Sequence, residues 1–305
     1  MKRELPDELK FLANRNAPQM PFTEDLTGKV CVITGATSGV GLEATRCLAG
    51  HGASLVLIAR NAHKAEAVAR ELRAAHPVPV SVILADFSDL EQVRAAAAEV
   101  IRNHPRVDIL INCAGMHSTR RTWTTAGHET VFCVNHLASF LLTSLLLDLL
   151  KRSAPARILQ INSEGHRFNG LDPADLDWKK RHYTGLRSYG ASKTAQLLTV
   201  REFADRLQGT GVTINAMHPG DVRTGIGSNN GWLYRTFTKY VTGLFLKDVS
   251  ISGPAIGYLV SAPGLADVSG RFFHLTREEK PAAHALDREM GKRVWEISRT
   301  LTGLD

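Results

Sequence analysis

The pattern of apolar residues after position 28 constrains the fold more than any other feature of this sequence. Short runs of β-branched and apolar residues alternate with longer segments of helical period. The short runs are apolar throughout, which is typical of strands buried on both faces of a parallel sheet. Since a helical segment follows nearly every run, we expect one open, doubly wound α/β domain of about seven strands, with helices on both faces. The predicted strands cover residues 29–34, 54–60, 80–86, 107–115, 156–163, 212–220 and 270–275.

Two long helices are predicted at about 129–151 and 189–208. Asn61 is placed to cap the helix after the second strand. Ser88 and Glu91 match a capping box before the helix that follows the third strand. In such sheets ligands bind beyond the C-terminal ends of the strands, so the residues directly after the strands are the candidates for a functional site.

The 305-residue chain is 44% hydrophobic and 22% charged, a composition that excludes disordered and fibrous proteins. Residues 1–27, with Pro6, Pro18 and Pro21, are predicted to form a polar extension that lies on a domain of residues 28–305. No apolar run approaches the roughly 20 residues of a membrane span. The N-terminus has no apolar core like that of a signal peptide. We therefore expect a soluble, cytoplasmic protein.

The formal net charge is +7, but the basic residues are spread along the chain without a Lys/Arg-rich run. A general anion-attracting surface is therefore favoured over nucleic-acid binding. The four cysteines lack CxxC spacing and are interpreted as small buried hydrophobic residues, with neither a disulfide nor a metal site. They are Cys31, Cys47, Cys113 and Cys133.

The segment "TGATSGVG" (34–41) joins the first predicted strand directly to a helix. Gly35 permits a tight turn, Gly39 lets the backbone approach a pyrophosphate, and Gly41 allows close packing of the helix on the strand. The GxxxGxG spacing departs from the general dinucleotide fingerprint GxGxxG, and a glycine-rich turn can also be a plain turn. Its position at the first strand-to-helix junction favours a dinucleotide site.

The end of the second strand bears on the choice of dinucleotide. NAD sites usually have an acidic residue there to bind the ribose 2′-hydroxyl, whereas this chain has Ala59 followed by Arg60. Arg60 can pair with a 2′-phosphate, which favours NADP(H), although a solvated loop arginine is the alternative. Asp86, after the third strand, either accepts a hydrogen bond from the adenine amino group or caps a helix.

Tyr189 and Lys193 are four residues apart in "SYGASK" and therefore neighbours on one helix face. An ammonium close to a phenol typically lowers the pKa of the phenol by roughly 1–3 units. We therefore expect Tyr189 to be a usable proton donor and acceptor. The alternative is an ordinary pair of side chains on a helix surface.

Six motifs occur in one order along the chain: "TGATSGVG", "NCAG" (112–115), Asn135, Ser163, "YGASK" (189–193) and "HPG" (218–220). In this order and spacing they resemble the short-chain dehydrogenase/reductase family. The resemblance covers the chain from about Asp25 to the last helix. It implies a Rossmann-like fold and hydride transfer between a nicotinamide and a carbonyl or alcohol.

The same resemblance assigns a catalytic set. It implies that Tyr189 is the acid/base and that Lys193 also binds the nicotinamide ribose. It implies that Ser163 holds the substrate oxygen and that Asn135 supports a water-linked proton relay. Chemically, hydride transfer to a carbonyl needs a proton donor for the developing alkoxide and a group that holds the oxygen.

The cofactor-binding set combines the strand-end residues with the family motifs. Pro219 and Gly220 resemble the family's turn beside the nicotinamide. Thr224 either donates to the carboxamide or to phosphate, or is a simple loop threonine. Cys113 replaces the second Asn of the family's usual NNAG. This replacement puts the side-chain hydrogen bond of that Asn in doubt, but the backbone of the segment can keep its role around the adenine ribose. The predicted residues are Gly35, Thr37, Ser38, Gly39, Val40, Gly41, Arg60, Asp86, Phe87, Asn112, Ala114, Gly115, Tyr189, Lys193, Pro219, Gly220, Val222 and Thr224.

The interval of 26 residues between Ser163 and Tyr189 exceeds that of the short form of the family. With "VNHLASFLLT" and "SEGHRF", it resembles the branch that contains retinol dehydrogenases and the short-chain domain of the WW-domain-containing oxidoreductase. This branch implies NADP(H) as cofactor. His166 recurs in the branch and is interpreted as structural. Family members are often homo-oligomers through the helices that carry Asn135 and Tyr189.

Residues 232–247 place many aromatic and aliphatic side chains among Arg235, Lys239 and Lys247. By resemblance, a substrate lid at about 225–250 is expected. An apolar lid favours a lipophilic substrate, such as a retinoid, steroid, long-chain aldehyde or polyketide-like ketone. A peripheral membrane contact and a core helix are the alternatives.

We therefore predict an NADP(H)-dependent oxidoreductase. A nucleotide-binding regulatory or scaffold protein of the same fold is the alternative.

Overall fold

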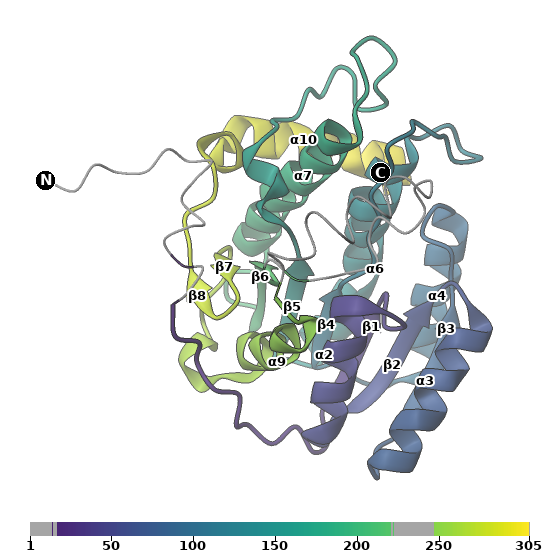
Figure 1. Ribbon diagram of the computed structural model, residues 1–305, viewed down its shortest axis with the longest axis vertical. Helices are drawn as coiled ribbons and strands as arrows, with labels where there is room; N and C mark the ends of the chain where they lie inside the picture. The colour runs from purple at the N-terminus through teal and green to yellow at the C-terminus, as the bar shows by residue number, and fades with distance from the viewer. Residues whose placement is uncertain (1–13, 15–16, 221, 223–246, 305) are drawn as a thin grey trace, which may run out of the picture.

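The computed structural model describes residues 14, 17–220, 222 and 247–304, and one sheet of eight strands runs through this part of the chain (Figure 1). The strand order is β3-β2-β1-β4-β5-β6-β7-β8, and neighbours pair in parallel except β7 and β8. The strands are β1 Val30–Thr34, β2 Ser54–Ala59, β3 Val80–Leu84, β4 Ile109–Asn112, β5 Ala156–Ile161, β6 Val212–His218, β7 Phe272–His274 and β8 Arg277–Glu278.

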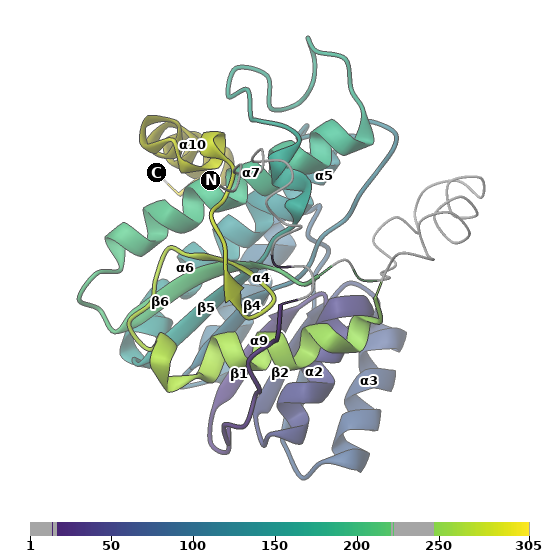
Figure 2. The same ribbon diagram turned by 60° about the vertical axis from the view of Figure 1, so that its left-hand side comes forward.

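Helices cover both faces of this sheet (Figure 2). Because successive side chains of a strand point to opposite faces, Cys31 and Ile33 of β1 pack with one group of helices and Val32 with the other. The first group is α2 Gly39–Gly50, α3 Ala62–Ala75 and α9 Ser252–Ser261, and the second is α4 Leu90–Asn103, α6 Ala138–Arg152 and α7 Gly185–Arg206. The last helix, α10 Arg288–Thr302, packs against α7.

The predicted parallel sheet is confirmed, with one strand more than expected. Most strands end one to three residues earlier than predicted, and β4 ends at Asn112 and not at residue 115. The extra strand, β8, has two residues and pairs antiparallel with β7. Two residues are too few to show a hydrophobic period, which is why the sequence does not reveal this strand.

The start of α4 differs from the prediction. Its N-cap is Asp89, whose side chain accepts a hydrogen bond from Glu91 N at 3.0 Å. The predicted capping box of Ser88 and Glu91 is wrong, because the Ser88 hydroxyl donates instead to Asp86 at 2.8 Å. The predicted cap of α3 is confirmed, since the Asn61 side chain accepts from a backbone amide of the first turn.

The helix predicted at about 129–151 is interrupted. It consists of α5 Thr130–Phe132, a π-helical turn at Cys133–Leu137, and α6. An 18-residue window within the span Thr130–Arg152 has a mean hydropathy of 1.7, so by length and composition the span could cross a membrane, which the sequence analysis did not anticipate. However, 72% of its apolar window is buried inside the protein, as in the core helix of a globular domain.

The described part of the N-terminal extension lies against the domain. Met20 N donates to Thr276 Oγ1 at 2.9 Å. The ring of Phe22 stacks on His51 with centroids 3.9 Å apart, and a Cβ placed at Gly257 of α9 would lie 2.3 Å from that ring. Residues 17–27 therefore cover α9 and the β7–β8 end of the sheet (Figure 2).

The strand order reverses between β1 and β4, and one hydroxyl joins their ends. Thr34 Oγ1 accepts hydrogen bonds from Cys113 N and Ala114 N, both at 2.9 Å. Thr34 itself is fully buried. The segment after β4 is thereby held against the turn after β1, at the switch point where such sheets bind ligands.

Thr34→Val should destabilise the protein because it leaves two amides without this acceptor. An unsatisfied buried polar group costs about 1–3 kcal/mol, so we expect the free energy of unfolding to fall by at least about 2 kcal/mol in urea titrations. Thr34→Ser keeps the hydroxyl and is the matched control. Equal stability of the Val and Ser variants would contradict the role of this hydroxyl.

Candidate active site

The glycine-rich turn between β1 and α2 has no room for side chains. A Cβ placed at Gly41 would lie 2.3 Å from Gly35 O, and one at Gly35 would lie 2.9 Å from Ala114 Cα. Gly35 and Gly39 have positive φ angles of 69° and 55°, which favour glycine. The start of α2 therefore packs directly on the end of β1.

The N-terminus of α2 is suited to an anion. Its N-cap, Ser38, has extended backbone angles, and the Ser38 side chain makes no capping hydrogen bond. The positive end of the helix dipole and the first amides are thus left for a ligand. Thr37 and Val40 lie in the same turn. The small residues and the uncapped helix end fit the pyrophosphate of a dinucleotide.

Arg60 and Asp86 are neighbours at the ends of β2 and β3. Arg60 Nη1 lies 3.8 Å from Asp86 Oδ2, and the Arg60 side chain is 66% exposed. Asp86 Oδ1 accepts from both the amide and the hydroxyl of Ser88, so this carboxylate shapes the turn before α4. Phe87 is buried in the core. An exposed ion pair of this kind contributes little stability, which leaves the Arg60 guanidinium available to another anion.

The segment after β4 contains predicted cofactor-binding residues that lie close to predicted catalytic residues. Asn112 Nδ2 donates to Thr143 Oγ1 at 2.8 Å and is buried. A Cβ placed at Gly115 would lie 3.3 Å from Asn135 Oδ1 and 3.9 Å from Lys193 Nζ. Gly115 therefore borders both predicted catalytic residues.

Asn135 is fully buried in the π-helical turn and fixes the segment after β4. Its Oδ1 accepts from Met116 N at 2.7 Å, and its Nδ2 donates to Met116 O and to Ser192 Oγ. The Asn135 carbonyl, displaced from regular α-helical bonding, accepts from Ser139 Oγ and from Gln196 Nε2. Such π-turns are frequent at functional sites.

Ser163 and Tyr189 meet at the end of β5. Ser163 Oγ accepts from Gly165 N at 3.1 Å, and the Ser163 hydroxyl lies close enough to the phenol of Tyr189 to lower the pKa of that phenol. Gly165 lies flat against the ring, since a Cβ there would be 3.0 Å from Tyr189 Cε1. A Cβ at Gly190 would lie 2.7 Å from Gly165 O. The glycines therefore allow α7 to bring Tyr189 close to Ser163.

Lys193 does not act on Tyr189 as the sequence suggested. Lys193 Nζ donates to Ile161 O and to Gln196 Oε1, both at 3.0 Å, and lies 5.6 Å from the centroid of the Tyr189 ring. Burial raises the pKa of Tyr189 to about 12, although the Ser163 hydroxyl opposes this rise. Burial lowers the pKa of Lys193 to about 8. The predicted lowering of the phenol pKa is therefore wrong, because burial is the largest influence on the phenol and raises its pKa.

Gln196 is a central residue of the site that the sequence analysis missed. It is 1% exposed and lies one turn after Lys193 on α7. Its Oε1 accepts from Lys193 Nζ and from Asn162 Nδ2 at 3.1 Å, while its Nε2 donates to the Asn135 carbonyl. A polar residue on a helix face that is otherwise buried is the signal that could have indicated it.

His166 is structural in this arrangement, as interpreted from the sequence. It is fully buried, its Nδ1 lies 2.8 Å from Ser163 O, and its Nε2 accepts from Ala282 N at 3.2 Å. With Nδ1 as the donor, both ring nitrogens are used by backbone groups. The ring therefore fixes the loop after β5 and does not offer a proton to a substrate.

The turn after β6 borders the same edge of the sheet. Ser252 Oγ donates to Pro219 O at 2.9 Å, and Gly220 has a φ of 89°. Val222 is buried and forms a single β-bridge with Lys247. Thr224 and most of the predicted lid at about 225–250 lie outside the described residues.

The structure thus brings Asn135, Ser163, Tyr189 and Lys193 together with Gly115, while Arg60 and Asp86 lie at the far strands β2 and β3. Between them lie the glycine turn and the uncapped start of α2. This arrangement places a phenol and a serine hydroxyl beside a buried ammonium, at one end of an extended site for an anionic ligand. It suits proton transfer to an oxygen held by Ser163.

Comparison with known proteins identifies the family. The family model of the short chain dehydrogenases matches residues 29–231. The chain belongs to the short-chain dehydrogenase/reductase family. It falls within the retinol dehydrogenase branch, and its relatives support a nicotinamide-binding oxidoreductase.

Two curated relatives and one solved structure illustrate the similarity. Retinol dehydrogenase 13 from Homo sapiens is 39% identical over 93% of this chain and 88% of its own length. Retinol dehydrogenase 12 from Mus musculus is 39% identical over 92% of this chain and 88% of its own length. The crystal structure of an uncharacterised protein from Mycobacterium Paratuberculosis, 27% identical, aligns with a TM-score of 0.75 over 94% of this chain and 98% of its own.

Gln196→Ala should lower the pKa of Lys193 below about 8, because the charged amine loses one of its two acceptors. We also expect a loss of about 1–3 kcal/mol of stability from the unpaired buried groups. NMR titration of protein with isotope-labelled lysine would measure the pKa. Gln208→Ala, in the exposed turn after α7, is the control. An unchanged Lys193 pKa in Gln196→Ala would contradict this arrangement.

Proposed function

We propose that this protein is an NADP(H)-dependent oxidoreductase that transfers hydride between the nicotinamide and a carbonyl or alcohol carbon of a lipophilic small molecule. The observation that carries the proposal is the convergence of Ser163, Tyr189 and Lys193 beside the glycine turn of a dinucleotide site. Ser163 follows β5, whereas Tyr189 and Lys193 lie on α7, so their geometry does not depend on a single loop.

The glycine turn at 35–41, Asn112 and Gly115 would hold the dinucleotide, with Lys193 toward the nicotinamide ribose as in the family. When bound, the nicotinamide supplies or accepts the hydride. Because Gly165 N donates to Ser163 Oγ, the Ser163 proton is left to bind the substrate oxygen. The Tyr189 hydroxyl then donates a proton to that oxygen as negative charge develops on it.

The pKa of Tyr189 bears on the direction of the reaction. With a pKa of about 12 the phenol is protonated at neutral pH. A protonated phenol is the state required to reduce a carbonyl, whereas oxidation of an alcohol requires its conjugate base. In the free protein at neutral pH, Tyr189 is therefore in the form that can donate a proton.

Arg60 supports NADP(H) over NAD(H). It lies directly after β2, at the same edge of the sheet as the start of α2, and its side chain is largely exposed. Its only ion pair among the described residues is with Asp86, at 3.8 Å. A 2′-phosphate would be a stronger partner for the planar guanidinium than this single long contact.

The substrate class rests on the relatives and on residues 232–247. The curated relatives described above are retinol dehydrogenases by name, and the segment 232–247 is rich in aromatic and aliphatic residues. Both favour a lipophilic carbonyl or alcohol such as a retinoid. A peripheral membrane contact through this segment and a homo-oligomer through the helices of Asn135 and Tyr189 belong to the same proposal.

Tyr189→Phe should reduce turnover by at least about 100-fold, because the proton donor is lost while the ring remains. Turnover would be measured with NADPH and a panel of retinal, steroid ketones and long-chain aldehydes, and cofactor binding by fluorescence. Binding should be unchanged. Tyr183→Phe is the matched control, since that phenol donates to Ser118 O away from the catalytic set. A scaffold role would be indicated by NADPH binding without turnover on any substrate of the panel.

Arg60→Ala should raise the KM for NADPH by about tenfold or more, since a charge-assisted hydrogen bond contributes about 1.5–3 kcal/mol. The KM for NADH should hardly change. Initial rates with both cofactors would measure the difference. Arg46→Ala, which removes an exposed arginine of α2 paired with Glu43 and Glu71, is the control. Equal effects on NADPH and NADH would argue against 2′-phosphate recognition.

A further inference from the structure

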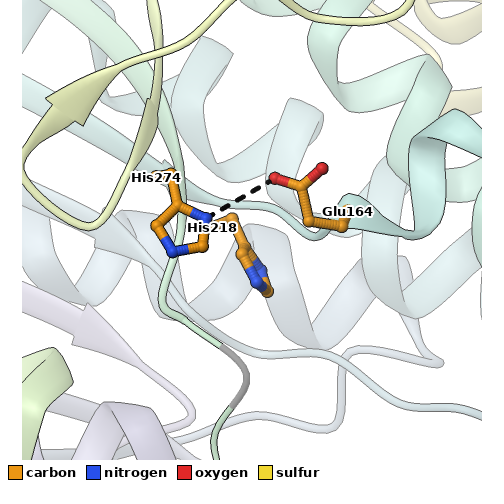
Figure 3. Close-up of side chains that lie close together, drawn as sticks. All are labelled: Glu164, His218 and His274. Carbon is orange, nitrogen blue, oxygen red and sulfur yellow. Dashed lines mark ion pairs between the residues drawn. The ribbon is translucent and has the colours of Figure 1, made fainter. Parts of the chain in front are cut away.

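Glu164, His218 and His274 form a buried cluster at the ends of three neighbouring strands (Figure 3). Glu164 follows β5 by a few residues, His218 is the last residue of β6, and His274 is the last residue of β7. Their exposures are 6%, 6% and 2%. None of the three has a part in the proposed proton transfer.

The three side chains turn toward one another. One ligand atom from each lies within 4.8 Å of the other two, and His274 Nδ1 is 3.9 Å from Glu164 Oε1. The two imidazole rings meet edge to face, with centroids 5.1 Å apart. His274 Nδ1 also lies 4.0 Å from Glu279 Oε2, and within the described part of the chain neither Glu164 Oε1 nor His274 Nδ1 has a partner at hydrogen-bond distance. Buried polar atoms are normally satisfied, so these two point to a ligand.

The surrounding charges hold the carboxylate in position. Arg167 donates to Glu164 Oε2 and also to Glu279, so that Oε1 of Glu164 is directed at the histidines. Glu279 also accepts from Asn14 Nδ2 at 3.0 Å. The two carboxylates share this one guanidinium, so Glu164 and Glu279 are only partly neutralised by Arg167. A bound cation would balance the remaining charge, and an outer partner such as Arg167 is typical of metal-binding carboxylates.

We propose that Glu164, His218 and His274 bind a divalent transition-metal ion, for which Zn²⁺ is the best match. Two imidazoles and a carboxylate are a common zinc ligand set, with water in the fourth position. Three atoms within 4.8 Å of one another have a common point at most about 2.8 Å from each (4.8 Å divided by the square root of 3), and Zn–N and Zn–O bonds measure about 2.0–2.2 Å. Each ligand atom must therefore move by less than about 1 Å to reach this bond length.

The ion would tie together the ends of β5, β6 and β7. Glu164 directly follows Ser163, and His218 directly precedes Pro219, so the metal would stabilise two segments that border the proposed active site. This inference does not depend on the proposed function, because no step of hydride transfer uses the ion.

The test is metal binding to the full-length protein. The purified protein is treated with a chelator, dialysed, incubated overnight with ZnCl₂ because the ligands are buried, and analysed by equilibrium dialysis with mass-spectrometric metal analysis. We expect one Zn²⁺ per chain and a higher Tm with the metal. Co²⁺ in place of Zn²⁺ should give the visible absorption bands of a four- or five-coordinate site. No saturable binding and no Co²⁺ bands in the folded protein would overturn the proposal.

Variants locate the site. His274→Gln should weaken Zn²⁺ binding at least about tenfold and remove the Co²⁺ bands. Glu164→Gln, which keeps the shape of the side chain, should do the same and serves if His274→Gln does not fold. His104→Gln, at the far end of α4, should bind like the unchanged protein. Folding is checked by circular dichroism. Full binding in both cluster variants, or its loss in His104→Gln, would show that the metal binds elsewhere.

Discussion

A buried ammonium organises the edge of the sheet where the proposed active site lies. Lys193 is 3% exposed, and burying an ion costs several kcal/mol unless acceptors surround it. Ile161 O at the end of β5 and Gln196 on α7 supply those acceptors. Because Gln196 also holds the Asn135 carbonyl, the strand, the helix and the π-turn are fixed relative to one another through one charge. The same burial lowers the pKa of Lys193 to about 8, so the amine is still mostly protonated at neutral pH.

Around Tyr189, glycine residues allow close packing, because they have no side chains that would keep the elements apart. Gly165 lies against the phenol ring, and Gly190 leaves space for the carbonyl of Gly165. At the other end of the site, Gly35 and Gly41 let the start of α2 approach the end of β1. Polar contacts therefore set the position of Lys193 and Asn135, whereas the absence of Cβ atoms sets the position of Tyr189 and of the dinucleotide turn.

The sequence predicted the parallel strands and the glycine turn, and it named four candidate catalytic residues, because these are local patterns or motifs of fixed spacing. It did not predict Gln196, whose role depends on contacts with Asn135 and Asn162 that are remote in sequence. The prediction that Lys193 lowers the pKa of Tyr189 was wrong, because the spacing of residues on a helix does not reveal how deeply they are buried. The N-cap of α4 was missed by one residue, since Ser88 and Asp89 are both good caps and only the turn made by Asp86 decides between them.

The π-turn at Cys133–Leu137 has a consequence for the length of this segment. A π-turn holds one residue more than an α-turn, and an α-helix rotates by about 100° per residue. A chain with one residue fewer between Phe132 and Ala138 would form a regular helix, and either Asn135 or the apolar face of α6 would then point away from its present partners. The segment must therefore keep its length even where its individual apolar residues can be exchanged.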